Sequence, residues 1–70
     1  MLSKQITHLR KKVGMSQSQL ADQLNVSPSA IGMYEQGRRI PDLPTLISIS
    51  RFFNVSLDYL ITGEEFTHSK

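Results

Sequence analysis

A short stretch in the middle of the chain combines small uncharged side chains with two adjacent cations. On a helix of 3.6 residues per turn, four of its residues share one face: Ser29, Gly32, Met33 and Gln36. A helix face that only meets solvent usually carries Glu and Lys, and this face carries no charge. Small uncharged groups suit contact with base edges in a groove, and the guanidinium groups of Arg38 and Arg39 suit phosphates. The stretch therefore predicts a helix that reads duplex DNA.

The residue types needed for catalysis or metal binding are absent or badly spaced. The chain has no cysteine, and it has no Ser/His/Asp set, paired carboxylates or glycine-rich phosphate loop. His8 and His68 have no neighbours at metal-ligand spacing. We therefore expect no enzyme activity, no metal site and no cofactor.

Length and charge indicate one small domain with a basic end. Seventy residues suffice for a single core. The net charge is +2, but residues 1–39 carry six Lys or Arg against two acidic residues, whereas residues 40–70 carry two against four. The excess positive charge of residues 1–39 suits binding to phosphate groups. No segment has the pattern of a membrane span or signal peptide, so we expect a cytoplasmic protein with no membrane partner.

Hydrophobic periodicity and capping residues predict three helices in the first part of the chain. The first covers residues 2–13 and ends at Gly14, where a left-handed residue fits. Ser16 has the spacing of a capping box that begins the second helix, and Asn25 occupies the turn after it. Ser27 caps the third helix, which ends at Gly37. The second and third helices form a helix-turn-helix.

Two further helices are predicted after Pro41. The fourth helix is capped by Asp42 and ends at Asn54. The short fifth helix is capped by Ser56 and ends at Gly63. The side chains predicted to face inward from these two helices are Leu43, Leu46, Ile49, Phe53, Leu57, Leu60 and Ile61. The sequence thus predicts a compact all-α domain of five helices in residues 1–63 and a polar tail in residues 64–70.

One long pattern resembles a known family. The chain reads Gln17-x-x-Leu20-Ala21-x-x-Leu24-x-Val26-Ser27-x-x-x-Ile31-x-x-Tyr34-Glu35-x-Gly37-x-Arg39-x-Pro41. This pattern resembles the phage repressor-like (Cro/repressor-type) helix-turn-helix family, and the similarity extends over residues 5–63. The resemblance implies a five-helix lambda-repressor-like fold. It also implies a DNA-binding transcriptional regulator, usually a dimer.

The resemblance also implies roles for single residues. The base-reading positions of the family correspond to Ser27, Pro28, Ser29, Gly32 and Met33. Its contacts with the DNA backbone correspond to Gln17, Gln36, Arg38 and Arg39. Arg10 and Glu35 match an ion pair that joins the first helix to the third. Pro28 has no N–H and Ser29 is short, so hydrogen-bonded readout is sparse and DNA shape should contribute to specificity.

The residues themselves leave two of these assignments open. Arg10 lies four residues after Ile6, and Glu35 lies four residues after Ile31, so each charge lies beside a row of core residues. Because an unpaired charge beside a core is costly, these positions favour an ion pair between the two side chains. The alternative is two side chains that reach solvent separately. Gly32 lies inside a helix, where Gly costs about 1 kcal/mol relative to Ala. Either a ligand approaches its backbone closely, or the cost is tolerated.

A dimer surface is predicted from apolar residues outside the inward stripes. Four such residues lie on the last two helices and the tail: Ile47, Phe52, Tyr59 and Phe66. Each alone is compatible with ordinary surface apolarity, whereas four together favour an interface.

The resulting hypothesis is a sequence-specific regulator of transcription that binds double-stranded DNA. It would act as a repressor, with a homodimer placing two third helices about 34 Å apart on a palindromic operator. The alternative is an antitoxin-like or protein-interaction module that binds a protein partner. In that case the acidic second half of the chain would provide the partner surface.

Overall fold

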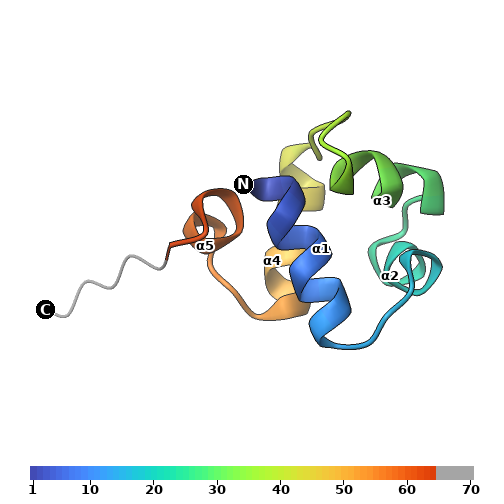
Figure 1. The fold of residues 1–70 in the computed structure, drawn as a ribbon, viewed down its shortest axis with the longest axis horizontal. Coiled ribbons are helices and arrows are strands. Elements are labelled where there is room, and N and C mark those ends of the chain that lie inside the picture. Colours follow the sequence, from blue (N-terminus) through green and yellow to red (C-terminus); the bar gives the residue numbers. More distant parts are fainter. Residues whose placement is uncertain (65–70) are drawn as a thin grey trace, which may run out of the picture.

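The computed structural model describes residues 1–64, and in this range the chain folds into five α-helices without strands (Figure 1). The helices are α1 (Leu2–Lys12), α2 (Gln17–Leu24), α3 (Pro28–Glu35), α4 (Leu43–Phe53) and α5 (Leu57–Thr62). The prediction of an all-α, five-helix domain is confirmed. The polar tail predicted for residues 64–70 lies outside the described residues from position 65 onward, and so does Phe66.

Four helices begin at a polar side chain that accepts a backbone N–H three residues later. The acceptors are Ser16, Ser27, Asp42 and Ser56, and the N···O distances are 2.9–3.1 Å. At α2 the capping box is complete, because the N–H of Ser16 also donates to Oε1 of Gln19 at 2.8 Å. These caps satisfy N–H groups that have no partner within the helix, and all four were predicted from the sequence.

The turn between α2 and α3 depends on a left-handed residue. Asn25 adopts φ 58° and ψ 42°, which asparagine tolerates better than most residues with a Cβ atom. The next N–H, that of Val26, donates to the carbonyl of Ala21 at 3.1 Å. The chain changes direction within the three residues 25–27, and α3 begins directly at Pro28.

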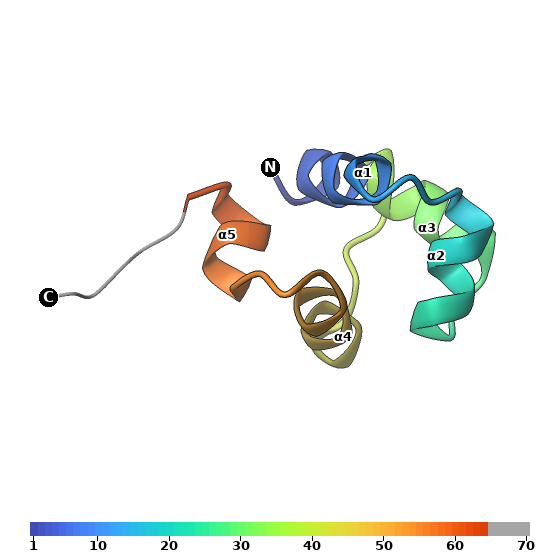
Figure 2. The ribbon, with the colours of Figure 1, turned by 90° about the horizontal axis from the view of Figure 1, so that it is seen from below.

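Every helix contributes one completely buried apolar side chain to a common core. These side chains are Ile6, Leu20, Ile31, Ile49 and Leu60. α1 packs against α3 and α5, α2 packs against α3 and α4, and α4 packs against α5. In Figure 2 the α2–α3 pair and α5 lie on opposite sides of α1. The helix-turn-helix therefore forms one end of the molecule, braced by α1 and α4.

Two residues predicted to face inward do not. Leu43 is 62% exposed and Ile61 is 46% exposed. Leu43 is the first residue of α4 and lies about 120° around the helix from the buried Ile49, because successive residues are about 100° apart. Ile61 directly follows the buried Leu60 in a helix of only six residues, so it points about 100° away from the core.

The residues proposed for a dimer surface differ in their exposure. Phe52 is 40% exposed, and its ring meets that of Phe53 edge-on with centroids 5.0 Å apart. Ile47 is half-buried. Tyr59 is also half-buried and packs against the core, which leaves less of its ring for a partner than the sequence indicated.

Within residues 1–64, no helix combines the length and apolarity needed to cross a membrane. Over the same residues, no three His, Cys, Asp or Glu side chains form a group suited to a metal ion.

Candidate nucleic-acid interface

The two faces of α3 differ as the sequence predicted. Ala30, Ile31 and Tyr34 are buried, with exposed fractions of at most 6%. The opposite face consists of Ser29, Gly32, Met33 and Gln36, all of them exposed or half-exposed. Because the inner face is fixed by the core, the outer face is held rigidly at the surface.

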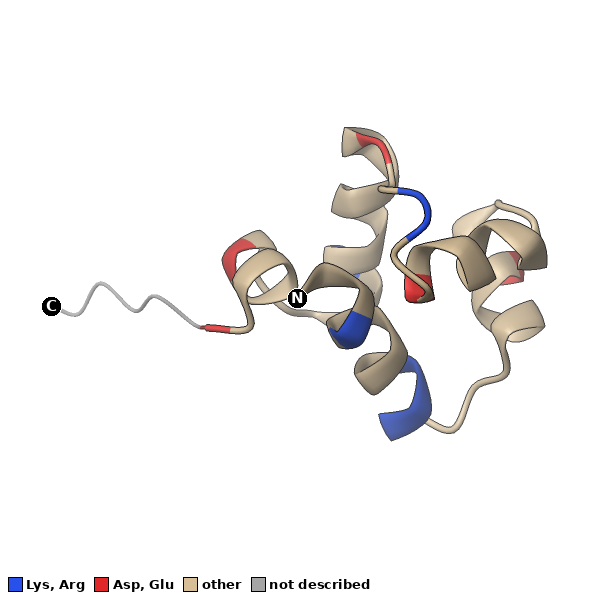
Figure 3. Cartoon of the chain, turned by 45° about the horizontal axis from the view of Figure 1, so that its top comes forward, with Lys and Arg blue, Asp and Glu red and all other residues tan. Residues whose placement is uncertain are grey.

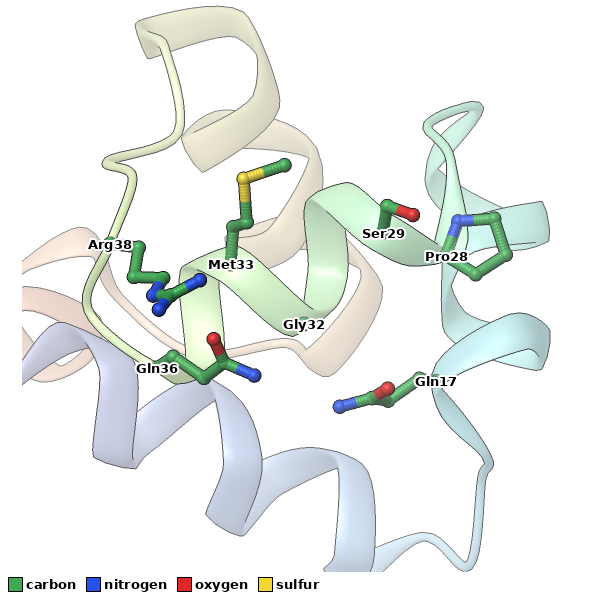
Figure 4. Close-up of a pocket in the computed structure, with 7 residues that line it drawn as sticks. All are labelled: Gln17, Pro28, Ser29, Gly32, Met33, Gln36 and Arg38. Carbon is green, nitrogen blue, oxygen red and sulfur yellow. The ribbon is translucent and has the colours of Figure 1, made fainter.

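A shallow groove of about 490 Å³ follows this outer face. Its lining residues are Gln17, Pro28, Ser29, Gly32, Met33, Gln36 and Arg38 (Figure 4). All seven belong to the nine residues proposed from the sequence as DNA contacts. Residues from α2, α3 and the following loop are thus brought together into one concave surface, which mixes apolar, amide and cationic groups.

The other two of the nine, Ser27 and Arg39, lie outside the groove. Ser27 is exposed, and its Oγ accepts the N–H of Ala30 at 3.1 Å. The hydroxyl proton of Ser27 is not used in that bond, so it remains suited to donate to a base or phosphate. Arg39 is exposed in the loop after α3.

Four exposed cations form two adjacent pairs, whereas Lys4 and Arg51 are exposed singly. Arg38, which also lines the groove, and Arg39 occupy the loop between α3 and α4, and Lys11 and Lys12 are exposed at the end of α1 (Figure 3). The loop begins at Gly37, whose φ of 74° turns the chain sharply away from the helix. Arg38 therefore adds a cationic group to the groove along α3.

The groove is open above Gly32 because this residue has no side chain. A Cβ atom placed there would lie 3.8 Å from Oε1 and 3.9 Å from Nε2 of Gln17, which are ordinary van der Waals distances. The protein itself therefore has room for a methyl group at position 32. A requirement for glycine at this position would come from a ligand.

We predict that Gly32→Ala raises stability and weakens DNA binding. Replacing Gly by Ala inside a helix should raise the free energy of unfolding by about 0.5–1 kcal/mol, since no internal contact opposes the methyl group. The methyl group would also hold a base edge away from the helix backbone. Chemical denaturation and a duplex-binding titration measure the two effects. Unchanged binding would show that the glycine is merely tolerated.

A partly buried ion pair joins Arg10 to Glu35, which also contacts the groove residue Gln17. Nε of Arg10 donates to Oε2 of Glu35 at 2.6 Å, and Nη2 donates to Oε1 at 3.1 Å. The two side chains are 12% and 7% exposed. Nη1 of Arg10 donates to the carbonyl of Met15 at 2.8 Å. The pair therefore joins α1, the loop after it and α3, and the alternative of two separate side chains does not apply.

The carboxylate of Glu35 has a further donor. Nε2 of Gln17 donates to its Oε1 at 3.0 Å. Burial raises the pKa of Glu35, but the hydrogen bonds from Arg10 and Gln17 outweigh this effect and leave the pKa below its ordinary value. The same contact with Glu35 raises the pKa of Arg10. Both groups are therefore charged at neutral pH. No pattern in the sequence indicated the bond between Gln17 and Glu35, because it joins residues of different helices.

Comparison with known proteins identifies the family. Residues 6–60 match the family model described as helix-turn-helix. The chain belongs to this helix-turn-helix family. The predicted resemblance to phage-repressor-like proteins is confirmed, and the fold agrees with it.

Two relatives from Bacillus subtilis (strain 168) illustrate the similarity. One is the "Uncharacterized HTH-type transcriptional regulator YqaE", 44% identical over 64 residues, which cover 91% of this chain and 55% of that protein. The other is the "HTH-type transcriptional regulator ImmR", 38% identical over 64 residues, which cover 91% of this chain and 50% of that protein. This helix-turn-helix chain spans about half the length of the curated relatives it matches.

A solved structure resembles the whole fold. The P22 c2 repressor in complex with the synthetic operator 9T superimposes with a TM-score of 0.87 at 30% sequence identity. The similarity covers 91% of this chain and 97% of that chain. These relatives are regulators and a repressor rather than enzymes, in agreement with the sequence-based expectation.

Proposed function

We propose that this helix-turn-helix chain binds double-stranded DNA with sequence specificity and regulates transcription, acting as a repressor when its site overlaps a promoter. The groove along α3 carries this proposal, because it collects seven of the nine residues expected to contact DNA. The similarity to a repressor in complex with its operator supports the same function. A protein with this target would work in the cytoplasm.

In the proposed complex, α3 lies in the major groove with its uncharged face toward the base edges. The hydroxyls of Ser27 and Ser29 offer hydrogen bonds, and Met33 offers an apolar contact for a thymine methyl group. Pro28 and Gly32 provide a close surface without donors. Because few side chains can form hydrogen bonds with bases, the sequence-dependent shape of the DNA would supply part of the specificity.

Contacts with the DNA backbone would fix the register of α3. Arg38 and Arg39 lie beyond its end, and Gln36 lines the groove beside them. Gln17 lies at the first position of α2, where free N–H groups also favour an anion. These contacts would lie on both sides of α3, so the helix would be held in the groove between two phosphate strands.

An NMR titration tests this function. The ¹⁵N-labelled protein is mixed with a mixed-sequence duplex of about 20 base pairs at low salt, where the phosphate contacts are strongest. We expect the largest amide shifts in α3, at Gln17 and in the loop after α3. Absence of shifts at these positions would contradict the proposal and favour a module that binds a protein partner.

We propose further that the active species is a homodimer on a palindromic site. Phe52 on α4 and Ile61 on α5 expose apolar side chains, and Ile47 is half-buried on α4. Two copies related by a two-fold axis through α4 and α5 could present their α3 helices to successive major grooves, about 34 Å apart.

Phe52→Ser tests the dimer. Removal of the exposed ring should weaken self-association at least about tenfold, as expected for an aromatic anchor of an interface. The matched control is Leu43→Ser, which removes a more exposed apolar side chain about 14 Å away along α4 and should leave association unchanged. Sedimentation velocity measures both variants. Only monomer at high micromolar concentration, with and without DNA, would contradict the dimer.

A further inference from the structure

Glu35 accepts hydrogen bonds from two different helices of the domain. Arg10 of α1 supplies two donors, and Gln17 of α2 supplies a third through its side-chain amide. The two residues differ in their surroundings, because Arg10 is nearly buried and Gln17 is exposed. The ion pair with Arg10 is enough to join α1 to α3. The bond to Gln17 therefore orders a side chain that would otherwise move freely in solvent.

This bond determines how the amide of Gln17 lies in the groove. One hydrogen of Nε2 points to Oε1 of Glu35, at an N···O distance of 3.0 Å. The amide group lies beside Gly32 and close enough for van der Waals contact with a Cβ atom placed there (Figure 4). The second hydrogen of Nε2 and the carbonyl oxygen remain available for a ligand.

We propose that Glu35 is a positioning residue for DNA binding, which holds the amide of Gln17 in the orientation that donates to a DNA phosphate. The proposal rests on the function proposed above. Holding the side chain in place before DNA arrives removes the entropy cost of ordering it on binding. It assigns Glu35 a second role, separate from the ion pair with Arg10.

The negative charge of Glu35 does not oppose this role. A free carboxylate close to a phosphate would repel it, but Arg10 lies against both carboxylate oxygens and cancels the charge. The side chain of Glu35 is also only 7% exposed, and the amide of Gln17 donates to its Oε1. A phosphate in the groove would meet the N–H of Gln17 and not the carboxylate.

A double-mutant cycle with Gln17→Met and Glu35→Gln tests the proposal. The Glu35→Gln side chain would offer one carbonyl oxygen to three donors, so the amide of Gln17 would lose its fixed orientation. Affinity is measured for a mixed-sequence duplex of about 20 base pairs at low salt, because phosphate contacts act on any sequence. We expect a loss of about tenfold for Gln17→Met and about fivefold for Glu35→Gln. In the Gln17→Met background, Glu35→Gln should have no further effect.

An NMR measurement on the wild-type protein tests the proposal without depending on the stability of the Glu35→Gln variant. The side-chain ¹⁵N–¹H₂ group of Gln17 should show restricted motion in ¹⁵N relaxation and proton shifts displaced from those of a free glutamine amide. Gln23, six residues further along the same helix and exposed, serves as the control and should show the relaxation of a mobile side chain. A Gln17 amide as mobile as that of Gln23 would overturn the proposal.

The outcomes of the cycle distinguish failure of the role proposed for Glu35 from failure of the proposed DNA binding. If the wild-type protein binds DNA but Glu35→Gln weakens binding equally in the wild-type and Gln17→Met backgrounds, Glu35 acts only through the fold and the inference fails alone. If the Glu35→Gln variant bound DNA with the same affinity as the wild type, the inference would also be overturned. If the wild-type protein binds no duplex at all, the proposed function fails and the inference falls with it.

Discussion

Arg10→Met is expected to lower the free energy of unfolding by about 3–5 kcal/mol, because it leaves the carboxylate of Glu35 nearly buried without its cation. A 70-residue domain has a free energy of unfolding of only about 4–10 kcal/mol, so this single change should remove much of its stability. Denaturation by urea at pH 7, followed by circular dichroism, measures the loss.

A double replacement provides the control for this prediction. Arg10→Met combined with Glu35→Leu removes both charges and replaces them with apolar side chains of similar size. We expect a protein about as stable as the wild type, since neither charge is left unpaired. A double variant as unstable as Arg10→Met alone would mean that the geometry of the pair, rather than the unpaired charge, determines the loss.

The ion pair also predicts the direction of the pH dependence. The pKa of Glu35 is lower in the folded protein than its ordinary value, so the folded state favours the ionised carboxylate. The corresponding stabilisation is complete above the ordinary pKa of a glutamate, about 4.3, and is lost as the pH falls through the lower folded value. The stability of the double variant should fall less steeply over this acidic range.

The second large effect is expected from Arg38→Ala combined with Arg39→Ala, which should weaken binding to duplex DNA about a hundredfold. Each guanidinium is proposed to form a charged hydrogen bond with a phosphate, and such a bond contributes about tenfold or more. The slope of log affinity against log salt should also become shallower by about two, since two fewer counterions are released. Both side chains are exposed, so the fold should remain intact.

Lys11→Ala combined with Lys12→Ala is the matched control. It removes the same charge from exposed positions at the end of α1, away from the groove. We expect a much smaller loss of affinity, since these side chains are exposed outside the groove. Equal losses for the two double variants would mean that only net charge determines binding, and the phosphate contacts assigned to the loop after α3 would be wrong.

Local signals in the sequence were sufficient to predict the helix boundaries. Ser16, Ser27, Asp42 and Ser56 all cap helices as predicted, because a cap depends on residues only three positions apart. The uncharged outer face of α3 was also predicted correctly. Apolar periodicity was less reliable at the ends of helices, where Leu43 and Ile61 are exposed because the core reaches only part of α4 and α5.

Contacts between helices were predicted less completely. The pairing of Arg10 with Glu35 was favoured by their positions beside the core, but its geometry and the bond from Gln17 required the packed arrangement of three helices. The exposure of Tyr59 was overestimated for the same reason, since its neighbours come from other elements. The preferred DNA sequence depends on the shape of both molecules together, which a protein sequence alone does not specify.

Selection from a random duplex library tests most directly whether the outer face of α3 reads a specific DNA sequence. The bound fraction is sequenced at two salt concentrations. We predict an enriched inverted repeat with half-sites about one helical turn apart, bound with an affinity that falls steeply as salt rises. Weak binding without any enriched sequence would contradict sequence-specific reading by α3, and a protein partner would then be the target to identify.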